Sequence, residues 1–172
     1  RAFLRQDPDI IMVGEIRDTP TAQIAIRAAL TGHLVFSTLH TNSAWDAITR
    51  LTDMGVEPYL LAASLRMVVA QRLVRLLCPH CKKASTDVML PALQEQYNIT
   101  QHFLPQGCPK CYFTGYLGRQ AVFETLPIDE EIGDMIKQGE RGSSIKAAGL
   151  GHNVALLAKA GDCSLVEVSQ FL

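Results

Sequence analysis

Four cysteines in two matched pairs are the residues whose types and spacing most directly suggest chemistry. Cys78 and Cys81 form the motif CPHC, Cys108 and Cys111 form CPKC, and 26 residues separate the two pairs. Two thiolates at this spacing can occupy adjacent corners of a tetrahedron, and a second pair completes a closed four-cysteine zinc site. Because four thiolates leave no position open for a substrate, the predicted Zn²⁺ is structural and supplies folding energy.

Three other interpretations of these cysteines stay open from spacing alone. A disulfide would require an oxidising compartment, a thioredoxin-like redox motif would need only one pair, and unrelated buried cysteines would need no pairing. Two matched CPxC units favour zinc over all three. The neighbouring His80 and His102 are expected to be loop residues rather than ligands, and the fifth cysteine, Cys163, a small buried hydrophobe.

A second group of polar residues follows two short apolar runs. Glu15 and Arg17 come directly after the run Ile10–Val13, and His40 follows the run at 34–38. If the two runs are neighbouring parallel strands, Glu15 and His40 leave the same edge of the sheet, where open α/β sheets bind ligands. A carboxylate there can hold a phosphate-bound Mg²⁺ or its waters, or orient an attacking water. The plainer alternative is that these are solvated loop charges.

Residues at and near the ends of these two predicted strands have separate expected roles. A histidine or hydroxyl at the second strand's end, such as His40 or Thr38, could sense a terminal phosphate. Arg17 could pair with a phosphate or stabilise a subunit contact. His33 precedes its strand, so it is expected at the opposite edge, with a structural or interfacial role.

The first third of the chain alternates predicted strands and helices. A strand at 10–13, buried on both faces, precedes a helix over 21–30 that begins at Thr19-Pro20 and stops at Gly32. After the strand at 34–38, Ser43 caps a helix that ends at Gly55. This order predicts parallel strands joined by helical crossovers, an α/β fold.

The rest of the chain is predicted to be mainly helical, apart from the cysteine region. A longer helix from Pro58 is expected, because Leu61, Leu65, Val69, Leu73 and Leu76 repeat at helical spacing. A strand is expected at 119–126. Short helices follow at 129–138, 143–149, 152–160 and 164–172, the last opening with a capping box at Ser164 and Glu167.

Composition limits the function classes. The chain has 172 residues, 48% of them apolar, and its net charge of −1 gives no electrostatic reason to expect nucleic acid binding. The apolar region 60–77 contains Arg66, Gln71, Arg72 and Arg75, so it is not predicted to span a membrane. Three domains are predicted, at 1–77, 78–118 and 119–172.

Several stretches together resemble one known family. "LRQDPDIIMVGEIRD" followed by "TGHLVFSTLHTNSA" resembles the secretion and pilus-assembly ATPase superfamily, and specifically its GspE/PilB-type branch, the type II secretion and type IV pilus assembly ATPases. The pattern "QRLVRLLCPHC", a second CPxC and "GYLGRQAVFE" resemble the zinc-bearing insertion of that branch. The resemblance covers roughly residues 3 to 128.

The resemblance implies a RecA-like core in a cytoplasmic homo-hexamer, peripheral to the inner membrane, that uses ATP and Mg²⁺ to push pseudopilin or pilin subunits. The implied partners are an inner-membrane platform and cytoplasmic adaptor proteins, without nucleic acid. Glu15 falls on the Walker B glutamate, and His33 and His40 on the histidine box. The cysteines fall on the tetracysteine metal site, which retraction-type relatives generally lack.

Other features separate this chain from a complete ATPase. No GxxxxGK[ST] phosphate-binding loop occurs, so we expect a C-terminal part of such an ATPase that cannot turn over ATP by itself. Residues 139–172 match the family only loosely. Two alternatives stay open: a zinc-ribbon nucleic-acid-binding module using Lys82, Lys83 and Lys110, and a structural docking module.

Overall fold

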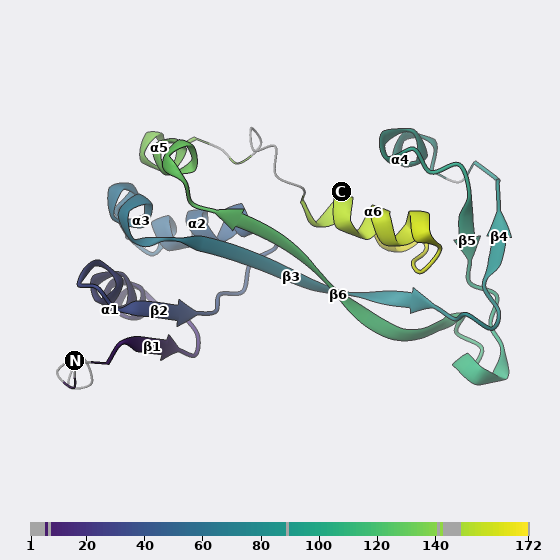
Figure 1. The fold of residues 1–172 in the computed structure, drawn as a ribbon, viewed down its shortest axis with the longest axis horizontal. Coiled ribbons are helices and arrows are strands. Elements are labelled where there is room, and N and C mark those ends of the chain that lie inside the picture. Colours follow the sequence, from purple (N-terminus) through teal and green to yellow (C-terminus); the bar gives the residue numbers. More distant parts are fainter. Residues whose placement is uncertain (1–5, 7, 89, 141, 143–148, 172) are drawn as a thin grey trace. The chain divides into compact units, whose positions relative to one another are not determined.

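The computed structural model describes residues 6, 8–88, 90–140, 142 and 149–171, and Figure 1 shows the order of its elements. The strands are β1 (Ile10–Val13), β2 (Leu34–Ser37), β3 (Met67–Leu77), β4 (Lys83–Ser85), β5 (His102–Leu104) and β6 (Tyr116–Pro127). The helices are α1 (Thr19–Leu30), α2 (Ala44–Asp53), α3 (Pro58–Ser64), α4 (Pro91–Tyr97), the 3₁₀ helix η2 (Pro109–Cys111), α5 (Glu130–Gln138), α6 (Leu150–Ala160) and α7 (Leu165–Ser169).

Contacts divide the chain into two compact units. The first unit contains residues 1–70 and 125–147, and the second contains 71–124 and 148–172. Strands β3 and β6 pair in a two-stranded sheet, and each unit contains one part of that pair. The three predicted domains at 1–77, 78–118 and 119–172 stay a prediction.

In the first unit, β1 and β2 are parallel and adjacent, as the sequence predicts. Ile10 lies opposite Leu34, and Val13 lies opposite Ser37. Helix α1 connects the two strands and packs against β2. After β2, Ser43 begins α2 with the predicted cap. The fold class is therefore the predicted α/β class, with parallel strands and helical crossovers.

Helix α1 begins at Thr19, as predicted, but the Thr19 hydroxyl, which the sequence suggested as the cap, does not cap it. Asp18, not Thr19, is the N-cap, and its carboxylate accepts a hydrogen bond of 2.8 Å from the Thr21 backbone N–H. An aspartate caps at least as well as a threonine, and Pro20 still lies in the first turn, where its missing N–H costs nothing.

The prediction that the strand at 10–13 is buried on both faces is wrong for the described chain. Ile11 is 7% exposed, whereas Ile10 is 59% and Met12 is 73% exposed. Alternate side chains of a strand point to opposite faces. Among the described residues, only the face that carries Ile11 is covered.

The long helix predicted from Pro58 is also wrong. Helix α3 ends at Ser64, and the next segment is the eleven-residue strand β3. Along β3 burial alternates: Ala70 and Val74 are buried, while Val69 and Leu73, assigned to the helical stripe, are exposed. Pairing with β6 and three β-branched valines favour the extended chain over the helix that the i, i+4 spacing suggested.

The C-terminal elements agree more closely with the sequence. The strand predicted at 119–126 is part of the longer β6, and the helices at 129–138 and 152–160 correspond to α5 and α6. The helix predicted at 143–149 lies outside the described residues except for Gly149. In the last predicted helix Ser164 caps α7, but the Glu167 carboxylate binds Arg75 instead of completing a capping box.

The second unit has its own core. Buried side chains of β3 and β6 belong to it together with residues of α6 and α7, among them Val74, Val122, Val154 and Leu165. Strands β4 and β5 form an antiparallel hairpin, with Lys83 opposite Leu104. None of the helices in the described ranges is both long enough and apolar enough to cross a membrane.

Candidate functional site

Glu15 and His40 lie together at one edge of the β1–β2 sheet. His40 Nε2 is 3.0 Å from Glu15 Oε1, and Arg17 Nε is 2.6 Å from Glu15 Oε2. The Glu15 side chain is only 22% exposed, whereas those of Arg17 and His40 are largely exposed. The predicted neighbouring arrangement of an acid and an imidazole is therefore present in the structure.

Two hydrogen bonds beyond the ends of the strands produce this arrangement. The Ile16 backbone N–H donates to the Thr38 carbonyl oxygen at 3.0 Å, and the Thr38 hydroxyl donates to the Gly14 carbonyl oxygen at 2.6 Å. These bonds continue the parallel pairing after Val13, so the residues that follow both strands stay at the same edge. The buried Ile16 anchors the segment on the far side of Glu15.

The electrostatics of the edge keep Glu15 ionised. The hydrogen bond from Arg17 is the largest cause that lowers the pKa of the Glu15 carboxyl, and the charges of Arg17 and His40 act in the same direction. The same contact raises the pKa of Arg17. An ionised carboxylate accepts hydrogen bonds and binds hard cations through oxygen, so Glu15 suits Mg²⁺, a Mg²⁺-bound water or an attacking water.

His33 lies at the other end of β2. Its Nδ1 is 3.0 Å from the Ala28 carbonyl oxygen and 3.2 Å from the Thr31 hydroxyl, so the imidazole contacts the C-terminal end of α1. Because β2 runs from Leu34 to Ser37, His33 and His40 lie at opposite ends of this strand, as predicted. The structure brings together Glu15, Arg17, Thr38 and His40 but not His33.

The second candidate site is the cysteine cluster, defined as Cys78, Cys81, Cys108 and Cys111. All four sulfur atoms lie within 4.8 Å of one another. Three Sγ–Sγ distances are 3.8 to 3.9 Å. A tetrahedral zinc ion with Zn–S bonds of about 2.3 Å places its sulfur ligands about 3.8 Å apart. The cluster therefore has the dimensions of a closed four-thiolate metal site, and its soft donors suit zinc.

Backbone groups around the cluster stabilise thiolate sulfur. The N–H groups of Cys108 and Gly115 donate to Cys111 Sγ at 3.2 and 3.3 Å. Burial raises the pKa of the Cys111 thiol, but these two hydrogen bonds, together with contacts from the Cys108 and Cys81 sulfur atoms, outweigh it and bring the pKa to about 6. At Cys81 burial dominates and raises the pKa to about 12. The opposite pKa shifts at Cys81 and Cys111 separate the ionisation of these two thiols, and a bound metal would supply the positive charge that favours both thiolates.

Residues near the cluster do not add further ligands among the described residues. His80 Nδ1 lies 3.5 Å from Lys110 Nζ, and His102, predicted to be a loop residue, is a buried residue of β5 whose Nε2 lies 3.0 Å from the Asp87 carbonyl oxygen. Cys163 is buried outside the cluster, as predicted for a small hydrophobe.

The sequence did not indicate the ion pair between Arg75, whose side chain is half exposed, and the buried Glu167. Arg75 Nε donates to Glu167 Oε1 at 2.8 Å, across 92 positions of the chain. The only sequence signal at Glu167 was its place in a capping box, which points to a local contact. To predict this contact, one would have needed to know that the strand carrying Arg75 lies next to the segment carrying Glu167.

Comparison with known proteins identifies the family. A family model described as "Type II/IV secretion system protein" matches residues 1–167. The chain belongs to this family. The match includes both strand ends and both cysteine pairs.

The chain is similar to longer members of the type II/IV secretion system protein family. It is 55% identical over 141 residues to type II secretion system protein E of Klebsiella pneumoniae, covering 81% of this chain and 28% of that protein. It is 47% identical over 173 residues to the type IV pilus assembly ATPase TfpB of Acinetobacter baylyi, covering 97% of this chain and 29% of that protein. The chain thus spans less than a third of the length of these relatives.

Solved structures support the fold. The crystal structure of the pilus retraction motor PilT with bound ADP matches with a TM-score of 0.67 at 27% identity, covering 100% of this chain and 42% of that chain. The ATPase DotB of Legionella pneumophila matches with the same TM-score at 23% identity, which supports the fold alone. The described chain therefore has the architecture of part of a secretion-family ATPase.

Proposed function

We propose that this chain is the C-terminal part of a cytoplasmic ATPase that powers pseudopilin or pilin assembly, for type II protein secretion or type IV pilus extension. The observation that carries the proposal is the meeting of Glu15 and His40 at one edge of a parallel sheet. This edge is where open α/β sheets bind their ligands. The names of the relatives, a type II secretion protein E and a type IV pilus assembly ATPase, support the same function.

In this proposal the charged edge acts on ATP and its Mg²⁺. When bound, Mg²⁺ neutralises charge that develops on the phosphates. Glu15 holds the ion through its waters, or orients the attacking water, since its carboxylate is ionised and at the sheet edge. His40 senses the terminal phosphate, and the Thr38 hydroxyl keeps the segment after β1 in register through its bond to the Gly14 carbonyl.

Two further residues have supporting roles. Arg17, which pairs with Glu15 in this structure, exchanges that partner for a phosphate or for a neighbouring subunit. His33 has a structural or interfacial role, because its ring contacts the end of α1 at the other end of β2.

The cysteine cluster holds a structural Zn²⁺ through Cys78, Cys81, Cys108 and Cys111. The sulfur spacing supports this, and four thiolates leave no open position for chemistry. Since retraction-type relatives generally lack a tetracysteine site, the cluster favours assembly or secretion over retraction.

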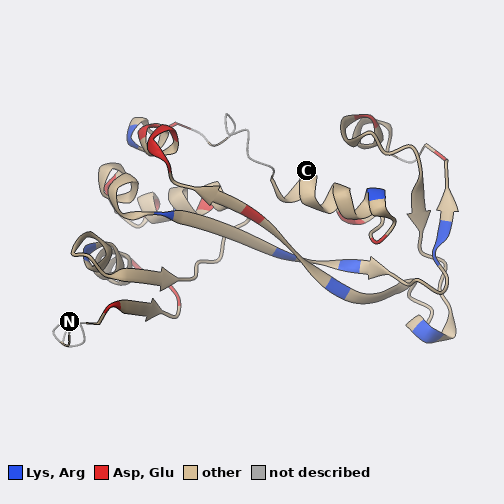
Figure 2. Ribbon diagram, in the orientation of Figure 1, with Lys and Arg blue, Asp and Glu red and all other residues tan. Residues whose placement is uncertain are grey.

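The whole protein is proposed to work as a homo-hexamer in the cytoplasm, peripheral to the inner membrane, with platform and adaptor proteins of the machine as partners. Nucleic acid is not among them. Figure 2 shows basic residues spread over several elements, including β3 and β6. Of the three lysines named in the zinc-ribbon alternative, Lys82 donates a hydrogen bond to the Gly161 carbonyl oxygen.

Magnesium-dependent ATP hydrolysis by the full-length protein tests the proposal. Glu15→Gln should reduce turnover by about 100-fold or more while folding stays intact, because general acid–base or water-positioning groups contribute that much. The control is Glu57→Gln in the same unit, since Glu57 has no side-chain capping bond before α3. Unchanged turnover in Glu15→Gln would refute the proposal.

A separate assay tests the expected inactivity of this chain alone. The purified 172-residue chain should release phosphate from ATP no faster than a preparation of its Glu15→Gln variant. Magnesium-dependent hydrolysis that Glu15→Gln abolishes would show that the chain is catalytically complete.

A further inference from the structure

The α6–α7 turn (161–164) contacts both chain segments that lead into the cysteine cluster. On the first segment, the Leu77 backbone N–H, one residue before the first cysteine, donates to the Asp162 carbonyl oxygen at 2.8 Å. On the second segment, which follows the last cysteine, the Tyr116 hydroxyl lies 3.1 Å from Ser164 Oγ. One short turn therefore contacts both of the chain segments, or arms, that carry the cysteine pairs: the one that ends at Leu77 and the one that begins at Tyr116.

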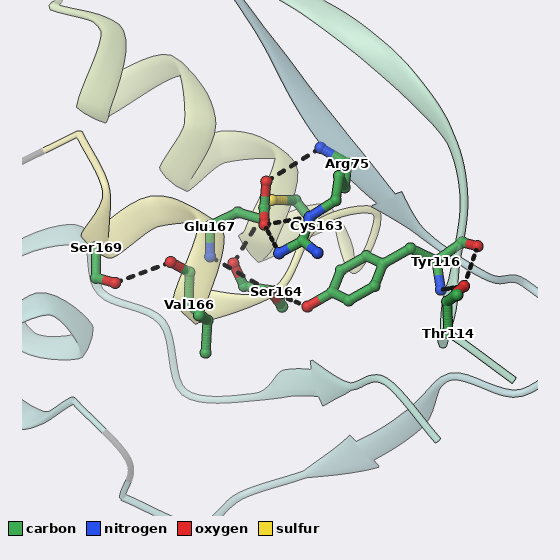
Figure 3. A network of polar contacts seen from close by, with 8 residues as sticks. All are labelled: Arg75, Thr114, Tyr116, Cys163, Ser164, Val166, Glu167 and Ser169. Carbon is green, nitrogen blue, oxygen red and sulfur yellow. Dashed lines mark hydrogen bonds and ion pairs between the residues drawn. The ribbon is translucent and has the colours of Figure 1, made fainter. Parts of the chain in front are cut away.

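An ion pair between the buried Glu167 and the half-exposed Arg75 strengthens this attachment. The Glu167 side chain is 5% exposed, and its two oxygens accept from Arg75: Oε1 from the guanidinium Nε at 2.8 Å and Oε2 from the backbone N–H at 3.1 Å. The same guanidinium lies over the Tyr116 ring, 4.2 Å from its centroid. Figure 3 shows the four side chains of Arg75, Tyr116, Ser164 and Glu167 in contact, and we call this group the tail clasp.

The tail clasp is directly continuous with the metal ligands. Gly115, the residue before Tyr116, donates its N–H to Cys111 Sγ at 3.3 Å and accepts at its carbonyl from the Cys78 N–H at 2.9 Å. A shift of Tyr116 away from the clasp would therefore move a group that bonds to both cysteine pairs.

We propose that the tail clasp and the metal site are thermodynamically coupled, so that docking of α7 tightens metal binding and metal binding tightens docking of α7. Both events bring the same two arms together. Whichever occurs first reduces the conformational entropy that the second must remove. Coupling free energies are reciprocal, so each event strengthens the other by the same factor.

The proposal rests on the metal assignment made above but not on ATPase activity. It makes Arg75 and Glu167 positioning residues for the cysteine cluster. Outer groups that orient metal ligands typically change metal affinity by about 10- to 100-fold when they are mutated. Glu167→Gln keeps the size of the side chain while removing its charge, so it weakens the clasp with little change in volume.

The test is the Zn²⁺ dissociation constant of the full 172-residue chain, measured by competition with a colorimetric chelator. Glu167→Gln should raise this constant about tenfold. The control is Asp134→Asn, which breaks an exposed ion pair with Lys137 and should leave the constant unchanged. If the Arg75–Glu167 pair merely stabilised the fold, its loss would destabilise the zinc-loaded and zinc-free chains equally. The Zn²⁺ dissociation constant would then stay unchanged.

Hydrogen exchange of the wild-type chain tests the reciprocal effect. Removal of zinc should speed exchange of the Glu167 and Val168 amides, which donate to Ser164 in the α7 cap. If Glu167→Gln does not fold, Tyr116→Phe decides, because it removes a single hydroxyl and should weaken zinc binding by a smaller factor. Equal zinc affinity in the clasp variants, or equal α7 exchange with and without zinc, would overturn the coupling. A chain that binds no zinc would overturn the metal assignment and the coupling together.

Discussion

Replacement of one cysteine of the cluster, Cys108→Ser, should unfold the cysteine region and leave the β1–β2 part of the chain folded. The apolar core of this region is small. Among described residues between 78 and 118, the buried non-cysteine hydrophobes are Leu93 and Ile99, each worth about 1.5–3 kcal/mol on burial. A structural zinc site is worth about 10–16 kcal/mol in small peptides. The metal is therefore the larger stabilising contribution.

The assay combines zinc content by elemental analysis with hydrogen exchange of individual amides. In Cys108→Ser, zinc should be lost, and the amides of β4, β5 and α4 should exchange freely. The amides of β1, β2 and α1 should stay protected, because they belong to the other compact unit. Asp134→Asn is the control, since it breaks an exposed ion pair with Lys137 in the other compact unit and should keep zinc. Loss of protection throughout the described chain, or retained zinc with full protection, would refute this reasoning.

Two further predictions concern a glycine and a helix cap. Gly115→Ala should reduce zinc content and melting temperature, because the new methyl would lie 2.4 Å from Pro105 Cβ. Gly118→Ala, at a similar positive φ but with open space, should cost only the backbone strain of about 1–2 kcal/mol; equal losses would contradict the steric argument. The hydrogen bond from Thr21 lowers the pKa of Asp18, so its stabilisation is present above the ordinary value of 3.8 and is lost as pH falls below it. Asp18→Asn should flatten the acid dependence of the denaturation midpoint, and identical pH profiles would refute this.

The sequence was sufficient where a local pattern and a simple topology rule agreed. Capping residues, glycines and short apolar runs predicted β1, β2 and the helices between and after them. The parallel order then placed Glu15 and His40 at one edge, where the structure has them 3.0 Å apart. The spacing of the two CPxC pairs was likewise sufficient to predict that four sulfur atoms come together.

The sequence was insufficient where distant contacts decide the structure. Residues 67–77 fit a helical stripe and an alternating strand alike, and pairing with β6, about 50 positions later, selects the strand. Glu167 fits a capping box, but its buried side chain instead binds Arg75, 92 positions away in the chain. In both cases the partner, β6 or Arg75, lies far away in the sequence. The pattern of neighbouring residues alone therefore favoured a helix and a capping box.

The central claim is that Glu15 and His40 act on the same nucleotide, and a double-mutant cycle tests it most directly. Magnesium-dependent ATP hydrolysis would be measured in the full-length protein carrying Glu15→Gln, His40→Ala and both changes. Groups that act as a unit lose activity non-additively. We expect the double variant to lose about as much turnover as the more damaged single variant. Losses that multiply, or single variants with normal turnover, would contradict the account.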